Sequence, residues 1–224
     1  HNKFIDFTEL LSHISEGRFT VGRSILRGVS DMLGALVGQG EMPFYFYDEP
    51  ERMKEICRRL NNAFLQVVKK QQDSVPRFYG GYSIGLYSLW CPSKCIWFQE
   101  DLTSLLSPQI YREFILECNE QACNEYEYSL IHLHPASFYL LDDLLGIKSL
   151  KVIQINKDVG GPSVKEMITV FRKVLEKKRL CIWGNLDERD IYEIKKNLPF
   201  NGLYLYVLAQ TVEEANMLAR LIKK

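Results

Sequence analysis

Short apolar segments alternate with longer amphipathic segments along most of this chain, and this rhythm most constrains the fold. From residue 96 onward the rhythm is regular, because each predicted strand is followed by a predicted helix. Strands that alternate with helices are typical of parallel βαβ units with right-handed crossovers. The predicted strands are Ile96–Glu100, Tyr128–His132, Val152–Asn156, Leu180–Trp183 and Leu203–Leu208, and the predicted helices are Pro108–Asn124, Ser137–Leu145, Ser163–Lys177, Glu188–Asn197 and Val212–Lys223.

The first 95 residues are less regular. The pattern predicts helices over Phe4–Ser15, Ser30–Leu36 and Glu49–Gln72, the last of which starts with an acidic and proline-containing turn. Phe19–Arg27 is strand-like, and Arg77–Leu89, rich in tyrosine and glycine, predicts an irregular strand or hairpin arm. Because no linker-like stretch interrupts the series, we expect residues 1–224 to form a single domain.

The two faces of the predicted strands differ in chemistry. In Val152–Asn156, for example, Ile153 and Ile155 alternate with Gln154 and Asn156. Strands of a doubly wound sheet carry helices on both faces and are apolar on both. Barrel strands instead turn one face to the helices and the other to a shared interior. The pattern therefore favours an α/β fold of the (β/α)8 TIM-barrel type.

Polar side chains gather where the predicted strands end. Asp101, His134, Asp158 and Asn185 each lie at or just beyond a strand end. Because barrel enzymes carry their chemistry at the carboxyl ends of the strands, this convergence predicts a site there. Asp101, Asp158 and Asn185 are the candidate catalytic residues, as acid, base or positioning groups. The alternative is a hydrogen-bonded rim that stabilises loops.

His132 and His134 are the candidate metal ligands, because two imidazoles on one strand face commonly bind zinc. A third ligand would come from Asp101, Asp158 or Glu100. The alternative is a pair of hydrogen-bonded barrel histidines. An amidohydrolase is excluded, because that class needs histidines on later strands and none follows His134.

Large and polar side chains on the inward faces are candidates for contacting a substrate. Core filling is the alternative for the aromatic members, because barrels fill their interiors with large side chains. The candidate substrate-binding residues are Trp97, Gln99, Asn156, Trp183 and Tyr206.

The six cysteines are scattered, which predicts reduced thiols rather than a disulfide framework. The closest pair, Cys91 and Cys95 in WCPSKC, is a weak zinc signal, because structural zinc takes four ligands and no second pair lies nearby.

Charge and hydropathy exclude two classes of partner. Lysine plus arginine number 28 and aspartate plus glutamate number 28, so no net positive charge attracts nucleic acid. No apolar run approaches the ~20 residues that a membrane span needs, and the polar start does not resemble a secretory leader. We therefore expect a cytoplasmic protein that acts on a small molecule.

Several segments resemble the superfamily of uroporphyrinogen decarboxylase and the cobamide-dependent methyltransferases. The resemblance covers nearly the whole chain from Phe19, and the fourth-strand and seventh-strand motifs are the more specific. The segments that carry the resemblance are FTVGRSILRGVSDMLGALVG, WFQEDLTSLLSPQIYREFIL, IHLHPAS, INKDVGGPS, WGNLDERD and LYVLAQTVEEANML.

The resemblance implies a barrel whose third strand is FTVGRSILRG, so that the first two strands are not in this chain. We therefore expect either an N-terminally truncated fragment or a homologue whose barrel closes differently. It also implies zinc as a candidate cofactor, a corrinoid carried by a partner protein, and a homodimer as one candidate assembly. The methyltransferases hold zinc through a histidine and two cysteines. This chain has His134 in place of the first cysteine and none at Leu208–Gln210, which weakens the match.

From the resemblance we expect a methyltransferase that acts on a small methylated or carboxylated substrate, with a corrinoid or thiol acceptor. A uroporphyrinogen decarboxylase-like lyase is the alternative, and the family's arginine-rich opening is not in this chain. A non-catalytic binding module on the same fold is a third possibility.

Overall fold

The computed structural model describes residues 2–223 and has a mixed α/β fold. A parallel six-stranded sheet has the strand order β1-β4-β5-β6-β7-β8, and β2 and β3 form an antiparallel hairpin. The chain divides after Leu130 into two compact units, which are described separately. The strands are β1 Leu26–Arg27, β2 Tyr82–Ile84, β3 Leu89–Cys91, β4 Cys95–Gln99, β5 Tyr128–Leu133, β6 Val152–Asn156, β7 Arg179–Gly184 and β8 Leu203–Val207.

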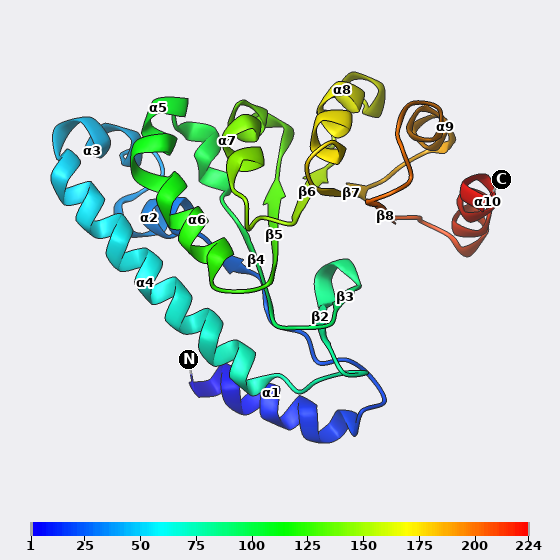
Figure 1. Ribbon diagram of the computed structural model, residues 1–224, viewed down its shortest axis with the longest axis horizontal. Helices are drawn as coiled ribbons and strands as arrows, with labels where there is room; N and C mark the ends of the chain where they lie inside the picture. Colours follow the sequence, from blue (N-terminus) through cyan, green and yellow to red (C-terminus); the bar gives the residue numbers. More distant parts are fainter. Residues whose placement is uncertain (1, 224) are drawn as a thin grey trace. The chain divides into compact units, whose positions relative to one another are not determined.

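One long amphipathic helix, α4, organises the amino-terminal unit. It begins at Pro50, and its apolar stripe, which includes Phe64 and Val68, is buried. The helix packs against α2 and α6 (Figure 1). Each fully buried side chain of this size contributes roughly 1.5–3 kcal/mol, so the stripe holds the unit together. The helices of this unit are α1 Asn2–Ser15, α2 Val29–Val37, α3 Met42–Asp48, α4 Pro50–Ser74, α5 Pro108–Ile110 and α6 Leu116–Asn124.

The amino-terminal unit differs from the sequence prediction in two places. The predicted strand Phe19–Arg27 contracts to β1, because the residues before Leu26 run as irregular chain. A Cβ added at Gly22 would lie 3.2 Å from the Cα of Gly85, so this irregular segment packs closely on the chain between β2 and β3. The sequence interpretation also missed α3, because its aromatic residues have high strand propensity.

The rest of this unit follows the prediction closely. The tyrosine-rich segment forms the hairpin of β2 and β3, joined by a 3-10 turn at Gly85–Tyr87. The predicted helix Pro108–Asn124 is helical throughout but contains a π-helical turn at Tyr111–Ile115 between α5 and α6. A second 3-10 turn, Asp101–Leu105, follows β4 directly.

The carboxyl-terminal unit has the alternating pattern that the sequence predicts. β6, β7 and β8 are parallel neighbours, and α8 packs against α9, which packs against α10 (Figure 1). The predicted bounds of Val152–Asn156, Glu188–Asn197 and Val212–Lys223 are confirmed residue for residue. The helical segments are the 3-10 helix Pro135–Leu140, α7 Leu141–Gly146, α8 Val164–Leu175, α9 Glu188–Asn197 and α10 Val212–Lys223.

Strand β8 is less buried than its apolar sequence suggests. All five of its residues are half-buried, whereas Ile153 and Ile155 of β6 and Leu180 and Ile182 of β7 are completely buried. β8 stands at the end of the strand order and, within residues 2–223, has only β7 as a sheet neighbour, which accounts for the difference.

Helix α8 starts with a capping box. The Ser163 hydroxyl accepts a hydrogen bond from the backbone N–H of Glu166, and the Glu166 carboxylate accepts one from the backbone N–H of Ser163 at 2.7 Å. We expect Ser163→Ala to lower the free energy of unfolding by about 1 kcal/mol, because one N–H loses its acceptor. Urea unfolding measures the loss. Ser163→Thr retains a hydroxyl that can accept from the Glu166 N–H and donate to the Glu166 carboxylate, and it should unfold within about 0.5 kcal/mol of the unsubstituted chain. Equal destabilisation by both substitutions would contradict this role.

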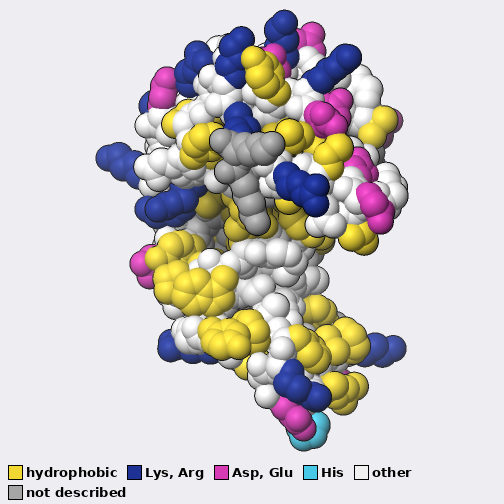
Figure 2. All heavy atoms as spheres, turned by 90° about the vertical axis from the view of Figure 1, so that its right-hand side faces the viewer, with side chains coloured by type: hydrophobic (Ala, Val, Ile, Leu, Met, Phe, Trp, Pro, Cys, Tyr) yellow, Lys and Arg dark blue, Asp and Glu magenta, His cyan; other side chains and the backbone are white. Residues whose placement is uncertain are grey.

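Two surface properties bear on partners. No helix within residues 2–223 combines the length and apolar character needed to cross a membrane. Figure 2 shows lysine and arginine side chains interspersed with aspartate and glutamate on the face it displays, in keeping with the balanced composition.

Candidate metal centre

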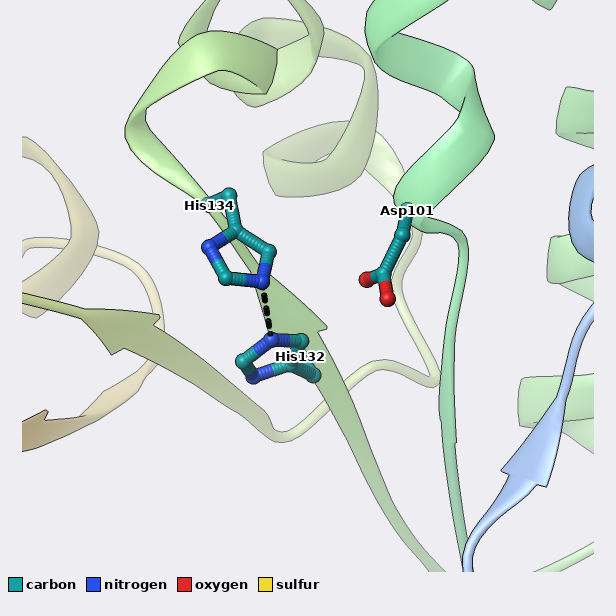
Figure 3. Close-up of side chains that lie close together, drawn as sticks. All are labelled: Asp101, His132 and His134. Atoms are coloured by element: carbon teal, nitrogen blue, oxygen red, sulfur yellow. Dashed lines mark hydrogen bonds between the residues drawn. The ribbon is translucent and has the colours of Figure 1, made fainter. Parts of the chain in front are cut away.

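Two histidine rings meet at the end of β5. His132 belongs to the strand and is buried, and His134 follows it and is half-buried. Their Nε2 atoms lie 2.9 Å apart (Figure 3), and the rings are nearly perpendicular, with centroids separated by 4.6 Å. At this separation one Nε2 must donate a hydrogen bond and the other accept it.

The Nδ1 atom of each ring faces an acceptor from β6 or its end. His132 Nδ1 is bonded to the Gln154 side-chain oxygen, and His134 Nδ1 lies 2.8 Å and 2.9 Å from the two carboxylate oxygens of Asp158. Asp158 also accepts a hydrogen bond from the Asn156 amide. Gln154, Asn156 and Asp158 are two residues apart, so they share one face of β6 and its extension. The sequence interpretation placed Gln154 on this face without a role.

The acceptors at Nδ1 bear on what the two Nε2 atoms can bind. If both Nδ1 atoms donate to these oxygens, both Nε2 atoms present lone pairs. Two lone pairs 2.9 Å apart suit a cation placed between them, and the Asp158 carboxylate lies beside the His134 ring.

Aromatic side chains on the next strands lie near the pair. The Trp183 ring of β7 is 6.4 Å from the His132 ring, centroid to centroid. Trp183 is paired in register with Asn156 on one side and with Tyr206 of β8 on the other. Tyr206 stacks on Tyr204, with ring planes 14° apart. Three of the five predicted substrate-binding residues thus occupy one level of adjacent strands.

Asn185, the third predicted catalytic residue, lies apart from this group. It is exposed, and its backbone carbonyl accepts a hydrogen bond from Lys157 at 2.8 Å. The same ammonium forms an ion pair with Asp190 in the first turn of α9. The sequence pattern did not predict these Lys157 contacts. The one signal for them in the sequence is that Lys157 directly follows β6.

In the amino-terminal unit, the predicted site residues Gln99 and Asp101 are bonded to each other. The Gln99 amide donates to the Asp101 carboxylate, which also lies 3.5 Å from the Arg27 guanidinium. Trp97 is completely buried with its ring edge against Tyr87, in agreement with core filling.

Glu100, which the sequence offered as an alternative ligand, has another role. Its buried carboxylate accepts hydrogen bonds from the backbone N–H groups of Val29 and Ser30, at 3.0 Å and 2.8 Å, and from the Ser30 hydroxyl. These groups open helix α2, so Glu100 caps that helix from β4. A Cβ at Gly28 would lie 2.2 Å from the Glu100 carboxylate, which explains the glycine. Burial raises the pKa of Glu100 to about 7 despite these donors.

Comparisons with known proteins leave the family open. No protein-family model matches the chain, and no curated protein matches it either. The fold and the histidine pair therefore define the class of protein as an α/β protein with a parallel sheet and a possible metal centre.

Proposed function

We propose that this chain belongs to the superfamily of uroporphyrinogen decarboxylase and the cobamide-dependent methyltransferases, and that its parallel sheet is part of a (β/α)8 barrel. In this proposal the chain transfers a methyl group from a small methylated or carboxylated substrate. The acceptor is a thiol or a corrinoid carried by a partner protein. The observation that carries the proposal is the His132–His134 pair, whose two Nε2 atoms share a position that suits a cation.

The residues present fit a zinc ion. Both Nε2 atoms are oriented by a hydrogen bond at the opposite ring nitrogen, which is the outer-shell arrangement typical of histidine ligands. In this proposal His132 and His134 hold the metal through their Nε2 atoms. When bound, zinc would act as a Lewis acid and lower the pKa of a thiol.

The surrounding side chains have distinct roles in the proposal. Asp158 keeps a proton on His134 Nδ1 and thereby directs the Nε2 lone pair away from β6. Trp183 and Tyr206 offer aromatic surface to an apolar methyl donor, and Asn156, whose amide donates to Asp158, offers its side-chain oxygen to a polar group of that donor. Asn185 stays a candidate catalytic residue in the exposed chain after β7.

The test combines metal content with product formation. The full chain is purified without chelator, its zinc is measured, and it is then incubated with methylated amines, alcohols or thiols and with reduced cobalamin, whose methylation changes its absorbance. The proposal predicts stoichiometric zinc and methylcobalamin that is lost in His132→Ala. Zinc-free protein that binds a porphyrin would instead favour the lyase. Protein with neither property would favour a binding module and contradict an enzymatic role.

A further inference from the structure

A buried guanidinium lies next to a cysteine sulfur in the amino-terminal unit. Arg23, in the irregular chain before β1, is only 6% exposed, and its Nη2 atom lies 3.3 Å from the sulfur of Cys95. The same nitrogen donates to the Cys95 carbonyl, which also accepts a hydrogen bond from Gln72. Among residues 2–223, no carboxylate forms an ion pair with Arg23. Arginine stays charged, and an unpaired buried charge is costly, so this position favours an anion.

A second thiol completes the arrangement. Cys91, at the end of β3, lies four residues before Cys95, at the start of β4. Its sulfur also lies 3.2 Å from the Ser93 carbonyl oxygen and 3.6 Å from that of Tyr82. The WCPSKC segment thus places two thiols on either side of the turn between β3 and β4. The Cys95 sulfur is the one that faces the guanidinium.

The electrostatics separate Cys95 from the other cysteines. The hydrogen bond from Cys91 and the charge of Arg23 lower the pKa of Cys95 to about 7, although burial opposes them. The hydrogen bond to Cys95 and burial raise the pKa of Cys91. Burial also raises to about 12 the pKa of three cysteines elsewhere in the chain, namely Cys57, Cys118 and Cys181.

We propose that Cys95 and Cys91 are a redox modification site, in which hydrogen peroxide oxidises the Cys95 thiolate and Cys91 resolves the product as a disulfide. The Cys95 sulfur attacks one peroxide oxygen, the O–O bond breaks, and the departing hydroxide takes up a proton to become water. The S–O bond formed in this step makes a sulfenic acid. The Cys91 sulfur then loses its proton and attacks the Cys95 sulfur, the S–O bond breaks, and a second water leaves. The two thiols together lose two electrons, and peroxide gains them.

The Cys95 side chain is completely buried, so a small oxidant reaches it only when the neighbouring hairpin opens. The strands of the β2–β3 hairpin are three residues long, and an isolated hairpin of this kind is only marginally stable. Trp90, beside Cys91, is 51% exposed, and Cys91 itself is 8% exposed. Local opening of this hairpin would expose the thiols to peroxide without global unfolding.

Peroxide titration of the full chain followed by alkylation and peptide mapping tests the proposal. At neutral pH we expect the loss of two thiols, recovered as a Cys91–Cys95 disulfide, while Cys57, Cys118 and Cys181 stay reduced. In Cys91→Ser, a dimedone adduct should form at Cys95. In Cys95→Ser, Cys91 should stay reduced at the same peroxide dose.

The charge of Arg23 is tested by rate. Arg23→Met should slow Cys95 oxidation at pH 7 severalfold, because it removes the positive charge beside the sulfur, and Arg23→Lys should retain most of the rate. The rate of Cys95 oxidation should rise with pH through about 7. The groups around Cys95 that titrate or carry charge are Arg23, Cys91, Tyr126 and Glu127.

Three outcomes would overturn the proposal. They are oxidation spread evenly over all six cysteines, unchanged oxidation of Cys91 in Cys95→Ser, and an Arg23→Met rate equal to that of the unsubstituted chain. Circular dichroism shows whether Arg23→Met is folded. If it is not, the pH profile of the unsubstituted chain and the rate of Arg23→Lys decide, and a rate flat below about pH 8 contradicts the proposal.

Discussion

Zinc affinity should fall at least a hundredfold in His132→Ala and in His134→Ala, because either change leaves a single imidazole where two Nε2 atoms now converge. Competition with a chromophoric chelator, carried out on the full chain, measures the affinity. His13, an exposed residue of α1, provides the matched control, and His13→Ala should bind zinc as the unsubstituted chain does. Equal affinities for all three variants would show that the histidine pair is not the metal site.

The outer contacts should affect zinc affinity less. In Asp158→Asn, the acceptor at His134 Nδ1 is weakened while the Nε2 atom remains. Loss of such a partner typically costs ten- to a hundredfold in metal affinity, so this variant should fall between His134→Ala and His13→Ala. An affinity unchanged in Asp158→Asn would show that Asp158 does not orient the ligand.

Removal of the Glu100 carboxylate should cause the largest loss of stability. Glu100→Ala leaves two buried backbone N–H groups and the Ser30 hydroxyl without their acceptor, and it opens a cavity at the start of α2. We expect about 3 kcal/mol less free energy of unfolding at pH 5, measured in urea. Glu100→Gln retains one acceptor oxygen and should lose less, whereas equal losses would contradict the capping role.

The same carboxyl group should make stability depend on pH. Its pKa is raised from 4.5 to about 7 in the folded protein, so between these values the folded state binds more protons than the unfolded state. Stability from this group is therefore present below pH 4.5 and is lost as pH rises through about 7, by about 3 kcal/mol in total.

Unfolding in urea between about pH 5 and about pH 8 should show this slope in the unsubstituted chain and a much flatter one in Glu100→Gln. Asp31 leaves a residual slope of the same sign, because burial also raises its pKa. The Glu100 charge also acts on Cys57 and Cys118, but the pKa of each thiol is raised to about 12, so neither contributes to the slope between about pH 5 and about pH 8. A slope that persists undiminished in Glu100→Gln would contradict the assignment.

Local pattern explains how much of the fold was predictable. The bounds of α9 and α10 were predicted residue for residue, because the signals that define them are local. Each helix has acidic residues in its first turn and an apolar periodicity along its own sequence. β1 was predicted too long, because the packing of Gly22 against Gly85 joins residues far apart in sequence. α3 was missed, because tertiary packing of Met42 and Phe46 overrides the strand propensity of its aromatic residues.

The candidate site was predictable to a similar extent. The rule that polar residues two apart share a strand face brought together His132, His134 and Asp158. The rule could not show that Glu100 turns from the sheet to cap α2, since its partners lie about seventy residues earlier. Nor could it show that Asn185 contributes its carbonyl rather than its side chain to the contact with Lys157.

The ring nitrogens of the histidines provide the most direct measurement of the central claim. In ¹⁵N-labelled chain, long-range ¹H–¹⁵N spectra distinguish protonated from unprotonated and metal-bound ring nitrogens for each of the four histidines. The account predicts that one equivalent of zinc shifts the Nε2 signals of His132 and His134 together, while both Nδ1 atoms remain protonated and His13 is unaffected. Zinc that shifts neither ring, or only one of them, would contradict it.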